Sequence, residues 1–359
     1  MDLIVVSPDS SLPASSFIRS HYEQLKNAGD YLYGGIPQTQ SLNSGSLSRP
    51  RLIDRLKLKL SGQNYHQYYL DLYLKKNKVK RVLAEYGPTA VGILQLCKSN
   101  GIELIVHFHG FDVYEKSTLK IYKNEYAAIF EYAKKIIAVS RDMVRALIDM
   151  GASAEKIVYT PCGPDPLFFD LQPDFNLNTF ISVGRFVEKK APILLLDAFS
   201  KVLKKCQDAQ LVMIGNGPLL GMSMSYVRYL NIVGSVKFLS QVDHTEIPEH
   251  IKKSFCFLQH SIVSTNGDAE GTPVSVMEAS LAGLPVIATN HKGISDVIIN
   301  GITGYLVNEF DTDSMAEHMI YLLNDKETAR AFGKAGMEFI QRHFSQKQHL
   351  TTLNQSIYG

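Results

Sequence analysis

Residues 270–289 read EGTPVSVMEASLAGLPVIAT, which predicts a loop, a helix and a strand in that order. Thr272 can cap a helix and Pro273 suits a first helical position, so the helix is expected to start there. Gly283 is expected to end it, because glycine is common just past a helix C-terminus. The apolar run Pro285–Ala288 then predicts a buried strand. A helix that leads directly into a buried strand is typical of a parallel α/β sheet.

The same alternation of apolar runs and amphipathic stretches fills the rest of the chain. Strands are expected at Leu3–Val6, Val79–Leu83, Glu103–Phe108, Ile136–Val139, Ile157–Tyr159, Thr179–Val183, Gln210–Ile214, Val236–Leu239, Phe255–Leu258, Pro285–Ala288 and Gly304–Val307. These are too many for one compact sheet of this kind, and a proline-rich stretch at 161–178 marks a linker. The sequence therefore predicts an α/β protein of two Rossmann-like, doubly wound parallel-sheet domains, 1–168 and 175–344, facing across a cleft.

Composition and termini favour a soluble globular protein. The chain of 359 residues is 45% hydrophobic and 20% charged, and no apolar run reaches the 18 residues of a transmembrane helix. The N-terminus MDLIVV lacks a basic region and predicts a first strand, not a signal peptide. The four cysteines form no C-x-x-C pair, so we expect reduced thiols in a cytoplasmic protein, without a zinc site or disulfide framework.

Two acids, Glu270 and Glu278, lie on either side of the predicted helix start. A helix N-terminus favours a phosphate, and a carboxylate accepts hydrogen bonds from sugar hydroxyls. This spacing fits a nucleotide sugar, with a hexose at Glu270 and a ribose at Glu278. In the alternative, Glu270 only complements the helix dipole and Glu278 is solvated. The apolar neighbours of Glu278 weigh against that alternative.

Two loops after strands of the second half also suit a ligand, because ligands bind at the carboxyl ends of such strands. Gly184 ends one strand, and Arg185 and Lys190 follow it as two cations suited to a diphosphate. The alternative is a solvated loop. Asn216 and Gly217 form part of a tight turn that either lets the backbone approach a ligand or only reverses the chain.

In the first half, the stretch ELIVHFHGFDV places His107, His109 and Asp112 just beyond a buried strand. Three readings stay open, namely a substrate-facing histidine, a satisfied structural histidine and a metal site. A third metal ligand is not evident from the sequence. At Asp311–Asp313 the pattern DTD could hold a metal-bound nucleotide, but Asp313 is more simply the N-cap of the next helix.

The run EGTPVSVMEASLAGLPVIATNHKGISDVIINGITGYLV is similar to the signature of glycosyltransferase family 4, whose members are retaining enzymes with the GT-B fold. The segments HFHGFD, IIAVSRDM, GRFVEKK, LVMIGNGP and VKFLSQV also fall in the order that this family shows. The resemblance covers nearly the whole chain.

The resemblance implies a role for each motif residue. Arg185 and Lys190 would bind and neutralise the donor diphosphate, without a metal or cofactor. Glu270 would contact the transferred sugar and Glu278 the ribose. The backbone of Gly271, Thr272 and Pro273 would line the sugar and phosphate pocket, His109 would lie near the reacting sugar, and a donor phosphate oxygen would take the acceptor proton. The residues 345–359 are expected to pack back on the N-terminal domain.

Two departures from the family pattern bear on the site. The loop after the first strand lacks the glycines common in relatives, and Ser15 and Ser16 are candidates to replace their contacts. Cys162 stands where relatives often have asparagine. The UDP-sugars come first and GDP-mannose second as expected donors, on the breadth of the family alone.

A basic segment lies in the N-terminal half, which is where the acceptor is expected to bind. Residues 49–81 hold ten basic side chains and two acids, interleaved with tyrosines and leucines. Such a surface could dock on anionic lipid, which would place the protein on the inner face of the membrane and suggest a lipid-linked acceptor. A solvated pair of helices is the alternative. Two alternative functions are an inactive sugar-nucleotide-binding protein and a nucleic-acid-binding protein, and no recognised module supports the second.

Overall fold

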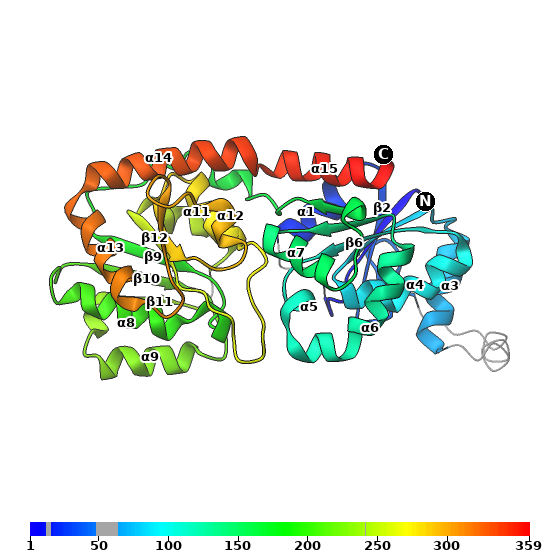
Figure 1. Cartoon of the computed structure of the whole chain (residues 1–359), viewed down its shortest axis with the longest axis horizontal. Coiled ribbons are helices and arrows are strands. Elements are labelled where there is room, and N and C mark those ends of the chain that lie inside the picture. The colour runs from blue at the N-terminus through cyan, green and yellow to red at the C-terminus, as the bar shows by residue number, and fades with distance from the viewer. Residues whose placement is uncertain (12–15, 48–63, 241) are drawn as a thin grey trace. The chain divides into compact units, whose positions relative to one another are not determined.

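The computed structural model describes residues 1–11, 16–47, 64–240 and 242–359. The chain forms two compact units. Unit 1 consists of Met1–Pro161 together with His349–Gly359, and unit 2 of Cys162–Gln348. Each unit is an α/β structure around its own sheet (Figure 1).

The sheet of unit 1 has eight strands in the order β4-β3-β2-β1-β5-β6-β7-β8. Their bounds are β1 Leu3–Val6, β2 Ala28–Tyr33, β3 Gln40–Ser41, β4 Gly45–Ser46, β5 Arg81–Glu85, β6 Glu103–Phe108, β7 Lys135–Ala138 and β8 Ile157–Tyr159. The pairs β2–β3 and β3–β4 are antiparallel, and the other pairs are parallel. The strand order reverses direction between β1 and β5, which makes their carboxyl ends the switch point where such sheets bind ligands.

Helices cover this sheet on both faces. They are α1 Ser16–Gln24, α3 Tyr65–Lys76, α4 Gly87–Asn100, α5 Phe111–Tyr114, α6 Lys116–Tyr132, α7 Arg141–Asp149 and α15 Gln346–Tyr358. On one face Leu353 and Ile357 of α15 pack with Ile18 of α1 and with strand residues such as Leu3 and Ile105. The last helix of the chain is therefore part of the core of unit 1, because it buries an apolar face there.

The sheet of unit 2 has six parallel strands in the order β11-β10-β9-β12-β13-β14. Their bounds are β9 Thr179–Val183, β10 Gln210–Ile214, β11 Val236–Leu239, β12 Cys256–Gln259, β13 Val286–Thr289 and β14 Gly304–Val307. Its switch point lies between β9 and β12. The loops that follow these two strands run to Lys190 and to Glu270, so the topology itself directs both side chains to one place.

Two apolar cores lie on the two faces of this sheet. One packs α8 Pro192–Leu203, α9 Leu220–Tyr229 and α13 Thr312–Asn324 against it. The other packs α10 Ile247–Lys252, α11 Val274–Leu281, α12 Ile294–Val297 and α14 Lys326–His343. The short 3-10 helices of unit 2 used below are η2 Pro166–Phe168, η3 Glu188–Lys190 and η5 His244–Glu246.

The prediction of two doubly wound α/β sheets is confirmed, and eleven of the strands were expected near their observed positions. Strands β2, β3 and β4 were not predicted, and β5 begins two residues later than predicted. The described residues include no helix that is both long enough and apolar enough to cross a membrane.

Candidate active site

The loop after β9 presents the two predicted cations in different surroundings. Gly184 ends the strand, and its amide donates to the Ile214 carbonyl oxygen at 2.9 Å, which holds the loop next to β10. Arg185 is exposed, and its guanidinium has no hydrogen-bond or ion-pair partner in the described parts of the chain. A small cavity beside it is lined in part by Gly184, Arg185, Lys190 and Gln259. A cation left without a partner beside a cavity is available to an anionic ligand.

Lys190 instead forms an ion pair with Glu270. Its Nζ lies 3.1 Å from Oε1 of Glu270, and the two side chains are only 17% and 8% exposed. Burial lowers the pKa of Lys190, and the Glu270 carboxylate offsets part of that effect. Burial would raise the pKa of Glu270, but Lys190 and Lys189 outweigh it and hold that pKa below its usual value. The Glu270 carboxylate is thus charged at neutral pH.

Two neighbouring loops hold Glu270 in place. Its backbone amide donates to Nε2 of His291, at 3.2 Å, in the loop after β13. The other ring nitrogen, Nδ1, lies 2.5 Å from Oε1 of Glu309, beyond β14. Because the carboxylate only accepts, Nδ1 carries the proton and Nε2 is free to accept from the Glu270 amide. A Cβ on Gly293 would lie 1.8 Å from the Gly271 carbonyl oxygen, so these loops pack closely only because residue 293 is glycine.

The helix between the two glutamates starts one residue later than predicted. Helix α11 begins at Val274, its N-cap is Pro273 rather than Thr272, and no side chain caps it. Pro273 has an extended backbone, with φ −72° and ψ 116°, which leaves Thr272 outside the helix. The amide groups of the first turn keep their affinity for an anion because no side chain occupies them.

Glu278 lies inside α11 and is buried rather than solvated. Its side chain is 7% exposed, and Oε1 lies 3.0 Å from Nε2 of His244 on η5. The His244 ring also packs edge-on against Phe168 of η2, with ring centroids 5.2 Å apart. The buried carboxylate of Glu278 therefore contacts an imidazole that is itself partly exposed to solvent and to a ligand.

The turn at 215–218 packs tightly against the loop after β9. The Phe186 amide donates to the Asn216 carbonyl oxygen at 2.9 Å. A Cβ on Gly217, whose φ is +155°, would come within 2.5 Å of the Phe186 carbonyl oxygen. The contacts of Asn216 and Gly217 therefore position the loop that carries Arg185.

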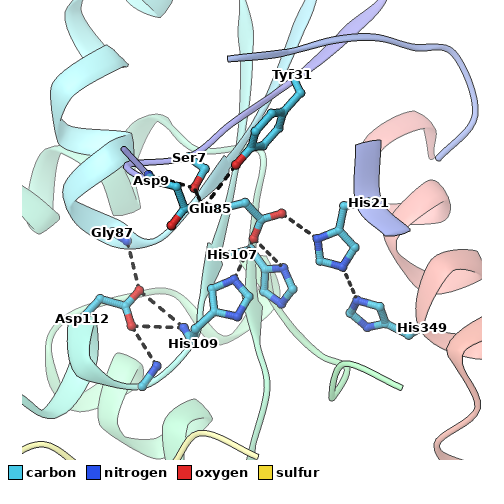
Figure 2. A network of polar contacts seen from close by, with 11 residues as sticks. Ser7, Asp9, His21, Tyr31, Glu85, Gly87, His107, His109, Asp112 and His349 are labelled. Atoms are coloured by element: carbon cyan, nitrogen blue, oxygen red, sulfur yellow. Dashed lines mark hydrogen bonds and ion pairs between the residues drawn. The ribbon is translucent and has the colours of Figure 1, made fainter. Parts of the chain in front are cut away.

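The unit 1 candidates gather around a residue that the sequence did not single out (Figure 2). Glu85 ends β5 and is fully buried, and three imidazoles contact its carboxylate. His21 Nδ1 of α1 lies at 2.6 Å, His109 Nε2 at 2.7 Å and His107 Nδ1 of β6 at 3.3 Å. Burial would raise the pKa of Glu85, but these histidines hold it well below its usual value.

The histidine cluster extends to the C-terminal helix. His349 of α15 lies with Nε2 2.9 Å from Nε2 of His21, and its Nδ1 is 3.0 Å from Oγ1 of Thr160. Burial lowers the pKa of His349 well below its usual value, and burial with His109 lowers the pKa of His107 to about 3. His21, His107 and His349 bring ring nitrogens within 4.8 Å of one another, so these three buried histidines could hold a metal ion.

Asp112 fits a structural role in the described contacts. Its carboxylate accepts from the backbone amides of Gly87, His109 and Gly110, at 3.0, 3.1 and 2.8 Å. It thereby shapes the turn that presents His109. Ser15 lies outside the described residues, and Ser16 begins α1, so the proposed role of the two serines stays a prediction.

The prediction of a basic, aromatic surface at 49–81 is wrong for the described part of that segment. Tyr68, Tyr69 and Tyr73 of α3 are buried in unit 1 and do not form an exposed aromatic surface. Arg81 pairs with Asp2 at 2.8 Å. The exposed basic residues of this part are Lys75, Lys76, Lys78 and Lys80. Residues 49–63, with the other basic side chains of the segment, lie outside the described residues.

The helix cap at the DTD pattern lies two positions before the aspartate predicted. Asp311 is the N-cap of α13, and its side chain accepts from the Ser314 amide at 2.9 Å. Asp313 lies in the first turn and pairs with Lys201 at 2.6 Å. Since both acids have structural partners, neither is part of the candidate site.

Several residues of the site escaped sequence reasoning. Glu85, His21, His349 and His244 contact residues far away in sequence and lie outside the quoted motifs, whereas His291 lies within the quoted family signature but was not singled out. A usable signal existed for Glu85, because a glutamate that directly ends an apolar strand is unusual unless it is paired or functional.

Two family models match the chain in succession. Residues 46–166 match "Glycosyltransferase Family 4" and residues 165–339 match "Glycosyl transferases group 1". Together they cover the unit 2 site and, in unit 1, Glu85, His107 and His109, but not His21 or His349.

Named relatives share between a quarter and a third of the sequence over the matched part. The amylovoran biosynthesis glycosyltransferase AmsK of Erwinia amylovora is 30% identical over 60% of this chain and 54% of its own length. A GDP-mannose-dependent alpha-(1-6)-phosphatidylinositol monomannoside mannosyltransferase of Mycobacterium tuberculosis is 29% identical over 52% of each chain. The chain thus spans about half the length of these two curated relatives.

Among solved structures, the sucrose-phosphate synthase of Thermosynechococcus elongatus has a similar fold. It superimposes with a TM-score of 0.77 over 99% of this chain and 98% of that one, at 20% identity. At this identity the likeness establishes the fold, which is GT-B.

Proposed function

The chain belongs to glycosyltransferase family 4, the group 1 glycosyltransferases, and we propose that it transfers a hexosyl residue from a nucleotide sugar with retention at the anomeric carbon. The acceptor is a glycan or a lipid-linked sugar of cell-surface polysaccharide or glycolipid synthesis. The names of the relatives support this range of acceptors, because one acts in amylovoran biosynthesis and another on a phosphatidylinositol mannoside. The donor is a UDP-sugar first and GDP-mannose second, as the family breadth suggests.

The Lys190–Glu270 pair is the observation that carries the proposal. A diphosphate beside the uncapped start of α11 would draw Lys190 toward itself and away from Glu270, and Arg185 has no partner to give up among the described residues. Glu270 would then accept hydrogen bonds from the hydroxyls of the sugar. The two cations stabilise the charge that develops on the leaving phosphate, which is an electrostatic form of catalysis that needs no metal.

The remaining residues complete the donor site. Glu278, with His244 beside it, takes the ribose hydroxyls, and the backbone of Gly271, Thr272 and Pro273 lines the phosphate and sugar. Gly184, Asn216 and Gly217 hold the loop that carries Arg185. His109 is the substrate-facing residue of unit 1. We place the protein in the cytoplasm, and any membrane attachment through 49–81 would depend on the basic side chains of that segment and not on its buried tyrosines.

A donor screen followed by turnover tests the proposal. UDP- and GDP-sugars are first ranked by the rise in melting temperature of the purified protein, and release of UDP or GDP is then measured with and without glycan acceptors. Lys190→Ala and Glu278→Ala should abolish transfer. Lys201→Ala and Glu249→Ala are matched controls, because those side chains pair with charged neighbours in unit 2 outside this site.

Unchanged turnover in both site variants would rule out the assignment of the donor site. Donor binding without release of nucleotide under any condition would instead favour the inactive sugar-nucleotide-binding protein. Anomeric configuration of the product, read by proton NMR, decides between retention and inversion.

A further inference from the structure

The Glu85 carboxylate of unit 1 contacts the side chain assigned to face the substrate. Its Oε2 lies 2.7 Å from Nε2 of His109 and its Oε1 lies 2.6 Å from Nδ1 of His21 (Figure 2). Glu85 has no exposed side-chain surface, so it cannot touch a substrate itself. Whatever it contributes must act through the imidazoles that it holds.

Ionised Glu85 fixes where the protons of its neighbours lie. A carboxylate is acceptor only, so Nε2 of His109 and Nδ1 of His21 are both donors. The position of the proton on one ring nitrogen determines what the other nitrogen can do. For His109, holding the proton at Nε2 leaves Nδ1 as an acceptor whenever the ring is neutral.

The ring of His109 is also held sterically. It lies between the rings of Tyr86 and His107, with centroid separations of 4.6 and 4.1 Å, and the side chain is 8% exposed. Its backbone amide is fixed by Asp112 at 3.1 Å. A ring held this way has few orientations open to it, so the hydrogen bond to Glu85 selects one.

The far side of Glu85 continues into the C-terminal helix. The second ring nitrogen of His21, Nε2, lies 2.9 Å from Nε2 of His349. Nδ1 of His349 in turn contacts Oγ1 of Thr160. A single proton between the two Nε2 atoms satisfies both rings. The chain Thr160–His349–His21–Glu85–His109 is thus continuous and buried, and one of its members belongs to α15.

We propose that Glu85 is a positioning residue for His109, and that His349 supports it from α15 through His21. The proposal rests on the proposed function only in taking His109 as the substrate-facing residue. It assigns the C-terminal helix a role in orienting a side chain of the site in addition to its role in packing.

The test compares Glu85→Gln and His349→Gln with Glu103→Gln. Glutamine keeps the shape of Glu85 but removes its charge and lets either a donor or an acceptor face His109. Glu103 is the matched control, because it starts β6, the strand that carries His107, and pairs with Arg81 at 2.9 Å without contacting a histidine. Nitrogen-15 NMR of the histidine side chains at mildly alkaline pH reports the tautomer of each ring in each variant.

We expect His109 to be a single Nε2–H tautomer in the wild type and in Glu103→Gln, and a mixture in Glu85→Gln. His349→Gln should change His109 in the same direction but less. In turnover assays Glu85→Gln should lower kcat about tenfold to a hundredfold, as loss of an outer partner of a functional histidine does elsewhere, and leave the KM for the donor unchanged. A purely structural role would lower stability without this split between kcat and KM.

Three results would overturn the proposal. One is an unchanged His109 tautomer in Glu85→Gln, and another is an unchanged kcat in a folded Glu85→Gln protein. The third is one equivalent of bound metal in the purified wild type that is lost in His349→Gln, because a metal on His21 Nε2 would replace its bond to His349. If the wild type transfers no sugar, the proposed function fails, and the NMR comparison still decides on the positioning of His109.

Discussion

Replacing Lys190 by methionine tests how strongly the donor site depends on its ion pair. The substitution keeps the length and apolar stem of the side chain but leaves the Glu270 carboxylate buried without its partner. Removing one member of a buried pair costs about 3–5 kcal/mol. Lys189 stays nearby, held by Asp268 at 3.0 Å, and still lowers the pKa of Glu270. We therefore expect the lower end of that range, about 3 kcal/mol.

A double-mutant cycle separates the pair from the packing around it. In Lys190→Met with Glu270→Gln no unpaired charge remains, so the double variant should be more stable than Lys190→Met alone. Urea denaturation followed by far-UV circular dichroism measures the free energy of unfolding. Lys201→Met is the control, since Lys201 is 28% exposed and its pairs with Asp197 and Asp313 should contribute less than about 1 kcal/mol.

The reasoning is refuted if Lys190→Met lies within about 0.5 kcal/mol of the wild type, which is the range of ordinary surface substitutions. The same result would mean that water already solvates Glu270. It is also refuted if the double variant is less stable than Lys190→Met, because the cost would then come from lost packing.

Two further predictions concern the loops of unit 2 and the acid response of unit 1. Gly293→Ala should lower stability by about 1–3 kcal/mol, because the added Cβ would lie 1.8 Å from the Gly271 carbonyl oxygen. Gly234→Ala is the control and should not lower stability, because its Cβ would have no atom within 4 Å. Thermal melts measure both variants. The pKa of His107 is about 3 in the folded protein and near 6.5 in the unfolded chain. Below about pH 6.5 the unfolded chain therefore binds a proton that the folded protein does not, and the free energy of unfolding falls. For this group the loss is no more than about 1.4 kcal/mol per pH unit. Protonation of Glu85, whose folded pKa is also depressed, adds to the loss only below its usual 4.5. Denaturant melts across pH should show less acid sensitivity in His107→Asn, and equal sensitivity would contradict the assignment.

Sequence periodicity predicted strands well where apolar residues were continuous and failed where a buried polar residue interrupted them. Strand β2, AGDYLY, contains Asp30, which is 5% exposed at the centre of unit 1. Its carboxylate accepts from the Ser41 hydroxyl at 2.5 Å, the Asn43 amide at 3.1 Å and the Tyr73 hydroxyl. Each of these partners lies on another element, so the local sequence gave no reason to bury an aspartate.

The residues of the candidate site were likewise predicted where they follow an apolar strand, but their contacts with one another were not. Arg185, Lys190 and Glu270 were found because each follows a strand, and the topology of parallel sheets brings strand ends together. The ion pair between Lys190 and Glu270 was not predicted, because it depends on side-chain directions set by two loops. The misplaced cap at Thr272 has a smaller cause, since one residue of extended backbone at Pro273 shifts the helix start.

The two switch points use buried charge in opposite ways. At the unit 2 switch point the charges are within reach of a ligand. Lys190 is 17% exposed and Arg185 has no partner among the described residues, so an incoming diphosphate can replace the Glu270 carboxylate as the partner of Lys190. At the unit 1 switch point the carboxylate of Glu85 is beyond reach of solvent and surrounded by imidazoles. A charge that a ligand can reach contributes to binding, whereas one that only imidazoles can reach sets their orientation. The geometry of unit 2 therefore suits the proposed binding of an anionic donor, and that of unit 1 suits the proposed orientation of a histidine.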